Sequence, residues 1–186
     1  MPRETSSDEA IDKAWVHSAP IHNAPITLAD YDPEWPRMFE RDAARIRSVL
    51  GGKVLRLEHV GSTSVPGLPA KPIIDMLLVL ADTADESGYV PALENAGYQL
   101  VIREPEWHEH RVFKGPDTNV NLHVFPDGST EIDRMLRFRD RLRSDDAARD
   151  LYANTKRELA ARTWKYVQNY ADAKSEVVEQ ILAQGL

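Results

Sequence analysis

Cysteine is absent from this chain of 186 residues. Its absence excludes disulfides, a thiol nucleophile and zinc–thiolate sites, and it fits a reducing compartment. No apolar run approaches the roughly 20 residues that span a bilayer, and the N-terminus lacks the apolar core of a signal peptide. We therefore expect a cytoplasmic protein with no membrane partner.

Positive charge is also in short supply, because 23 Lys and Arg face 30 Asp and Glu, for a net charge of −7. This balance disfavours nonspecific binding to a nucleic-acid backbone. The length suits one domain with a real core. Apolar and charged contents of 42% and 28% are ordinary for a globular protein.

The hydrophobic patterns predict a mixed α/β half followed, after about Gly128, by a helical half. Residues 1–24 are polar without a strong period, and we expect a flexible tail there, with a short helix over about 8–16. Residues 25–186 are expected to form a single domain. Periodicity, breakers and turn signals predict helices over about 36–50, 90–96, 131–143, 144–159 and 167–182, and strands over 54–60, 73–80, 98–102, 110–114 and 119–125.

The stretch from Glu58 to Leu80 carries the strongest functional signal. Gly61 breaks a strand, and the hydroxyls of Ser62 and Thr63 follow, where a helix start with free N–H groups can hold a phosphate. Asp75 is the one charge in an apolar run, and a buried carboxylate is costly unless it is paired or binds a cation. The alternative is purely structural: a tight turn, a helix cap and a buried hydrogen-bond acceptor.

This stretch resembles the GrpB family. The chain reads E-H-V-G-S-T-S-V-P-G-L over residues 58–68 and K-P-I-I-D over 71–75, close to the family pattern, and Y-D-P-E-W-P over 31–36 resembles the family's entry motif. The resemblance extends from about Ile26 to the C-terminus. It implies a nucleotidyltransferase-like fold of the DNA polymerase beta superfamily: an α/β (α+β) mixed sheet with helices on one face and a C-terminal helical extension.

The superfamily also implies a site. Its Gly-Ser turn holds nucleotide phosphates, and three strand carboxylates, two of them in Asp-x-Asp, hold two Mg²⁺ ions for phosphoryl transfer. Here Gly61 and Ser62 take the phosphate turn and Asp75 the first carboxylate. Leu77 stands in place of the second carboxylate, and His123 is the candidate at the third. One Asp and one His cannot copy a three-carboxylate site.

Three interpretations of this pair stay open. A single divalent metal, Mg²⁺, Mn²⁺ or Zn²⁺, lies between Asp75, His123 and His59, although imidazole suits zinc or manganese better than magnesium. Alternatively, His123 acts as a general base oriented by Asp75. In the third interpretation the site binds a phosphorylated ligand without turning it over.

Several cations are candidates for phosphate binding. Lys71 lies close to the Gly-Ser turn, and Arg111 lies on the hairpin arm that neighbours His123, where it would aim at the pocket. Each has a plainer alternative as a solvated or surface-paired residue. The helical half contributes three more cations that would close the pocket: Arg139, Lys156 and Lys174.

We therefore expect a GrpB-family, nucleotidyltransferase-like protein that binds or acts on a nucleotide or another phosphorylated small molecule, with metal assistance. One alternative is a catalytically degenerate accessory or binding module, since GrpB-like domains occur fused to dephospho-CoA kinase. Another is an acid–base enzyme that uses His123 and has lost nucleotidyl transfer. The missing second carboxylate favours the accessory role, and the polar cluster between Gly61 and Asp75 favours the enzyme.

Overall fold

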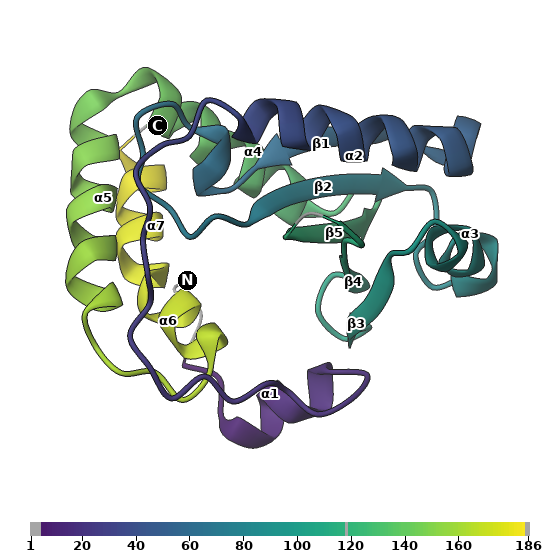
Figure 1. The fold of residues 1–186 in the computed structure, drawn as a ribbon, viewed down its shortest axis with the longest axis horizontal. Helices are drawn as coiled ribbons and strands as arrows, with labels where there is room; N and C mark the ends of the chain where they lie inside the picture. The colour runs from purple at the N-terminus through teal and green to yellow at the C-terminus, as the bar shows by residue number, and fades with distance from the viewer. Residues whose placement is uncertain (1–4, 118, 185–186) are drawn as a thin grey trace.

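A computed structural model describes residues 5–117 and 119–184 of the chain (Figure 1). A five-stranded sheet with the order β1-β2-β5-β4-β3 lies at its centre. The central pair, β2 and β5, is parallel, and the other neighbours are antiparallel. The strands are β1 (Arg56–Val60), β2 (Ile74–Leu80), β3 (Gln99–Glu104), β4 (His110–Lys114) and β5 (Val120–Pro126).

One face of the sheet is covered by α2 (Trp35–Leu50) and α3 (Val90–Asn95). Apolar residues at helical spacing, among them Phe39, Ala43 and Ile46, turn the buried stripe of α2 toward the sheet, as the sequence pattern predicts. Together with the inward side chains of all five strands they form the main core, which fixes the positions of the strands that carry the candidate site.

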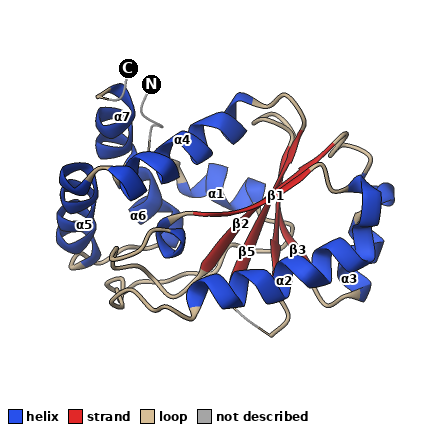
Figure 2. Ribbon diagram, turned by 90° about the horizontal axis from the view of Figure 1, so that it is seen from above, coloured by secondary structure: helices blue, strands red, loops and turns tan. Residues whose placement is uncertain are grey.

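The helical extension comprises the last four helices, which Figure 2 shows gathered on one side of the sheet. The first of them also packs on the second face of the sheet, where Ile132 meets Leu77 and Phe125. The mixed α/β fold with a C-terminal helical extension is confirmed, with α2 and α3 on one face and this helix on part of the other. None of the described helices combines the length and apolarity that crossing a membrane requires. The four are α4 (Thr130–Ser144), α5 (Asp146–Ala160), α6 (Val167–Ala173) and α7 (Ser175–Ala183).

The sequence pattern predicts one helix over residues 167–182, but the structure divides them into α6 and α7. Lys174 is the capping residue between the two helices. The break therefore places this lysine at a helix junction rather than in mid-helix.

The N-terminal segment lies against the body instead of extending from it, which differs from the tail expected there. Its helix α1 (Asp8–Ala14) buries Ile11 in a cluster with Tyr166. Trp15 forms a bridge with Ile102 of β3, and the backbone of residue 6 bonds to the carboxylate of Asp172 in α6. The segment thus links the outer strand of the sheet to the helical extension, and Figure 1 shows α1 between them. A few scattered apolar residues make these contacts, and the polar composition of the segment does not indicate them.

Candidate functional site

A tight turn connects β1 to the site. Gly61 has φ 69° and ψ −173°, a region that is essentially restricted to glycine. A Cβ at this position would lie 2.5 Å from Oδ2 of Asp75. The hydroxyl of Ser64 donates to the carbonyl of Gly61 at 2.6 Å and closes the turn. Glycine is therefore required twice, by the backbone conformation and by the close approach of the carboxylate.

Substitution of Gly61 by alanine should destabilise the protein by at least about 2 kcal/mol, since both strain and a clash with Asp75 oppose the added methyl group. Urea unfolding measures the loss. Gly52→Ala is the matched control, because its added Cβ meets nothing within 4 Å and Gly52 lacks a positive φ. Equal stability of the two variants would contradict the requirement.

Asp75 and His123 lie together on the second face of the sheet, as the alternation of both strands predicts. Nε2 of His123 lies 3.3 Å from Oδ1 of Asp75, and the amide of Asn121 donates to the same oxygen at 3.3 Å. Burial raises the pKa of Asp75, but the hydrogen bond and charge of His123, together with Lys71, outweigh it and hold the pKa below its usual range. The two side chains remain 29% and 24% exposed, so a ligand can reach them.

A row of hydrogen bonds continues from His123 across the sheet. Nδ1 of His123 lies 3.1 Å from Nε2 of His110, whose Nδ1 lies 2.7 Å from a carboxylate oxygen of Glu104. The two imidazole rings stack with an interplanar angle of 7°. These contacts fix the ring of His123 from behind, so its orientation at Asp75 is built into β3, β4 and β5.

Lys156 of α5 lies against the turn. The residue is 2% exposed, and its Nζ donates to Oγ of Ser62 at 2.7 Å and to the carbonyl of Pro69 at 2.6 Å. Burial and then the positive charge of Lys174 lower the pKa of Lys156 to about 6, against the attraction of Asp75. A buried amine is thus held directly beside the hydroxyl predicted to bind phosphate.

Two more lysines with depressed pKa values accompany it. Burial and the charge of Lys174 lower the pKa of Lys71 to about 8, and burial lowers the pKa of Lys174 to about 8. Both amines lie near the ring of Tyr170, at 5.7 and 4.3 Å from its centre. The hydroxyl of Tyr170 is buried and has no hydrogen-bond partner in the described part of the chain.

A fourth amine comes from the sheet itself. Lys114 of β4 donates to the side-chain oxygen of Asn121 at 2.5 Å, and burial lowers its pKa. Asp75 is the carboxylate whose charge acts on all four amines. We call this set the lysine cradle: Lys71, Lys114, Lys156 and Lys174 around Asp75.

Two predicted site residues point the other way, and their predicted placement is corrected. His59 pairs with Met76 and therefore faces α2, where its ring stacks on Phe39 and its Nε2 bonds to Thr63. Arg111 pairs with Val124, so its side chain leaves the face that carries His123.

The bonds of Arg111 confirm its direction, since it is buried and donates to the carboxylate of Glu86 at 2.7 Å. Two further candidates lie beside the turn but bond elsewhere. The hydroxyl of Thr63 donates to the carbonyl of Ile73, and Arg139 donates to Glu58 and to the carbonyl of residue 59. Of the predicted phosphate-binding residues, Gly61 and Ser62 thus form the turn beside the cradle, and three cations belong to the cradle: Lys71, Lys156 and Lys174.

The residues around Asp75 do not fit a resident divalent metal. With His59 on the opposite face, Asp75 and His123 are the two protein ligands left, and four amines surround them. No group of three or more His, Cys, Asp or Glu with metal-binding geometry occurs among the described residues. A cation held by two ligands beside four amines is electrostatically unfavourable.

Residues 25–184, which contain the whole cradle, match the family described as GrpB protein. The chain belongs to the GrpB family. It is 62% identical to UPF0157 protein BH1888 of Halalkalibacterium halodurans over 95% of this chain and 90% of the relative. A crystal structure of GrpB from Enterococcus faecalis, 29% identical, superposes with a TM-score of 0.73 over 86% of this chain and 99% of that one.

GrpB sequence also occurs within longer proteins. A dephospho-CoA kinase of Mycolicibacterium paratuberculosis is 29% identical over 83% of this chain, and the matching part makes up 44% of that protein. The GrpB unit therefore accompanies a separate region in that relative.

Three features of the site are absent from the residues predicted from the sequence: Lys114, Asn121 and the role of His110. Asn121 precedes His123 by two residues, so strand alternation alone places it on the same face. Lys114 requires the hairpin register, which pairs it with Asn121. His110 begins β4, and its contact with His123 depends on the pairing of β4 with β5.

Proposed function

We propose that the lysine cradle binds the phosphate groups of a nucleotide or another phosphorylated small molecule. The observation that carries this proposal is the charge balance: four amines share one carboxylate at a turn that ends in the hydroxyl of Ser62. Neighbouring like charges and burial make the protonated amines costly without a counter-ion. A phosphate group supplies the missing negative charge and several acceptor oxygens.

The unpartnered hydroxyl of Tyr170 supports the same proposal. Within the described part of the chain this buried hydroxyl has no partner, which costs free energy, and such groups are usually satisfied in native proteins. It belongs to the side chain whose ring faces the amines of Lys71 and Lys174. An oxygen-rich ligand among these amines would also give this hydroxyl a partner.

Binding rather than two-metal transfer is the activity that these residues favour. Leu77 stands at the position of the superfamily's second carboxylate. Here it is buried in an apolar cluster with Phe125. A metal that helps this site would arrive with the phosphate ligand, whose oxygens complete its coordination. A binding unit is also compatible with the occurrence of GrpB sequence beside a dephospho-CoA kinase in one relative.

The test is a thermal-shift and calorimetric screen of pyrophosphate, tripolyphosphate, nucleotides and CoA precursors, each with and without Mg²⁺. A ligand at 100 times its dissociation constant stabilises by about 2.7 kcal/mol, which corresponds to a melting shift of about 5–10 °C for a domain of this size. Lys174→Met removes one charge-assisted contact and should weaken binding by about 10- to 100-fold.

Lys13→Met is the matched control, since Lys13 is 77% exposed on α1 and lies 3.8 Å from Glu106. It should bind as the wild type does. If none of these ligands shifts the melting temperature at millimolar concentration, or if both lysine variants lose affinity equally, the cradle is not a phosphate site.

A further inference from the structure

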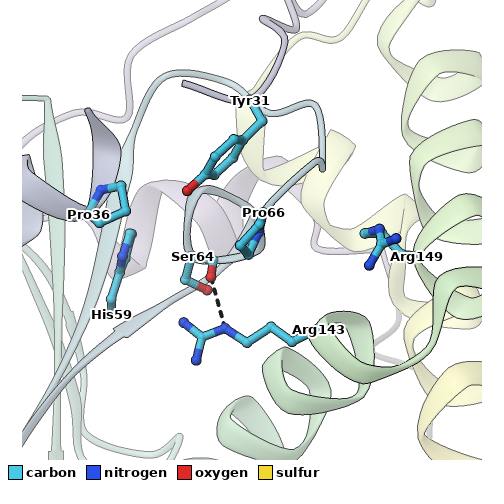
Figure 3. A pocket seen from close by; sticks show the side chains of 7 residues that line it. All are labelled: Tyr31, Pro36, His59, Ser64, Pro66, Arg143 and Arg149. Carbon is cyan, nitrogen blue, oxygen red and sulfur yellow. Dashed lines mark hydrogen bonds between the residues drawn. The ribbon is translucent and has the colours of Figure 1, made fainter. Parts of the chain in front are cut away.

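A recess with a volume of about 300 Å³ lies beside the turn that holds Ser64 and Pro66 (Figure 3). It forms where the corner between α4 and α5 meets the start of α2. None of the residues that line it belongs to the lysine cradle, although five of them lie in the two stretches that resemble the family motifs: Tyr31, Pro36, His59, Ser64 and Pro66. Its volume is at the lower end of the range of small-molecule sites.

One wall is cationic. Arg143 from the end of α4 and Arg149 from the first turn of α5 both line the recess. Nε of Arg143 donates to the carbonyl of Ser64 at 2.9 Å, which fixes the plane of the guanidinium, and Figure 3 shows this bond as a dashed line.

Arg143 is weakly neutralised. A carboxylate oxygen of Asp140 lies 4.0 Å from its Nη1, while the same oxygen bonds to Arg139 at 2.8 Å. Burial and then the charge of Arg139 lower the pKa of Arg143, so its positive charge is costly where it stands. Arg149 is better paired, at 2.6 Å from Asp146.

The other walls are apolar or neutral. Pro36, Pro66 and the ring of Tyr31 line the recess, and Figure 3 shows Tyr31 extending its hydroxyl toward the side of His59. Burial lowers the pKa of His59 to about 4, so its ring adds no positive charge near pH 7. The recess therefore joins a cationic end to an apolar body.

We propose that this recess binds a small organic anion, a carboxylate or phosphate monoester that carries a compact apolar group. The anionic end meets Arg143, whose planar fork suits both groups, and Arg149 adds charge at the rim. The apolar group packs between the two prolines and Tyr31. This site is independent of the proposed phosphate site in the cradle.

The experiment uses the full chain, labelled with ¹⁵N, and titrates it with benzoate and phenyl phosphate. Benzyl alcohol and benzylamine are the neutral and cationic counterparts. The backbone amide of Ser64 and the Nε–H of Arg143 report on the recess, because both residues line it and Nε of Arg143 donates to the carbonyl of Ser64. We expect saturable shifts with both anions and at least tenfold weaker binding of the other two probes.

Variants locate the site. Arg143→Gln should weaken binding of both anions at least tenfold, and Arg149→Gln several-fold. Arg137 is an exposed arginine on the same helix as Arg143, and Arg137→Gln should leave the affinity for both anions unchanged. Arg149→Gln keeps the bond between Arg143 and Ser64. It therefore tests the contribution of the arginines to anion binding even if Arg143→Gln disturbs the turn.

Three outcomes overturn the proposal: equal binding of benzyl alcohol, unchanged affinity in both Arg143→Gln and Arg149→Gln, or loss of both anions in Lys174→Met alone. The last result would place the anions in the cradle. Failure of pyrophosphate to bind the cradle leaves this test unaffected, since the arginine variants report on the recess and Lys174→Met reports separately on the cradle.

Discussion

Binding of a phosphate ligand to the lysine cradle should take up at least one proton from solution at pH 8, and the principal acceptor should be Lys156. With a pKa of about 6 in the free protein, Lys156 is almost entirely neutral at this pH, and Lys71 and Lys174, with pKa values of about 8, are partly neutral. A bound polyanion favours the charged form of each amine and raises its pKa. A phosphate monoester is already fully ionised, because its second pKa is about 6.

The sign of the pH dependence follows from this uptake. Affinity should fall as pH rises above 8, by about tenfold per pH unit for each proton taken up. Calorimetry at one pH in buffers of different ionisation enthalpy measures the number of protons directly. Lys156→Met should lower the uptake by about one, and Lys13→Met should leave it unchanged. Binding without any proton uptake at pH 8 would show that the cradle amines are already charged.

The depressed pKa of Lys156 should also make the free energy of unfolding depend on pH when no ligand is bound. Lys156 binds a proton in the unfolded chain up to its ordinary pKa of about 10.4, but in the folded chain only up to about 6. The unfolded state therefore binds more protons across this range, and the free energy of unfolding rises with pH. The contribution is about 1.4 kcal/mol per pH unit between about pH 6 and 10, and it is lost as pH falls toward 6.

Lys156→Met removes this contribution and keeps an unbranched side chain that is one atom shorter. The difference in unfolding free energy between the wild type and this variant should grow in favour of the wild type by about 2.7 kcal/mol from pH 6.5 to 8.5. The hydrogen bonds to Ser62 and Pro69 that the variant loses add an offset that does not change with pH. Urea unfolding at three pH values is the measurement. Parallel stability curves would mean that Lys156 is charged in the folded protein throughout.

Strand alternation and the signature motif are enough to find the centre of the site. Asp75 interrupts an apolar strand, and His123 alternates with the buried residues of its own strand, so the pattern along the chain is sufficient to place both. The GrpB resemblance adds Gly61 and Ser62 at the turn. All four residues belong to short patterns of neighbouring residues, and such patterns are visible in the sequence alone.

Orientation across strands is harder to predict. His59 and Arg111 neighbour the site in sequence, but the side chain of each leaves the sheet on the opposite face from Asp75 and His123. A shift of one residue in register reverses the face, and the sequence contains no direct record of register.

The convergence of the lysines depends on tertiary structure. Lys71, Lys156 and Lys174 come from a loop, a helix and a helix junction, and nothing in the spacing of the three residues brings them together. The family resemblance suggests only that the helical half closes the site. Their depressed pKa values arise from burial in the folded chain and, for Lys71 and Lys156, also from the positive charge of Lys174.

The N-terminal segment has a consequence for self-association. β3 is an outer strand of the sheet, and an uncovered outer strand presents free N–H and C=O groups that can pair with another chain. Here Trp15 pairs with Ile102, and the N–H of Val16 donates to the carbonyl of Val101 at 2.9 Å. Trp15 and Val16 therefore cover part of this edge, and we expect a chain that lacks the residues before Pro25 to associate more readily with a second molecule through β3.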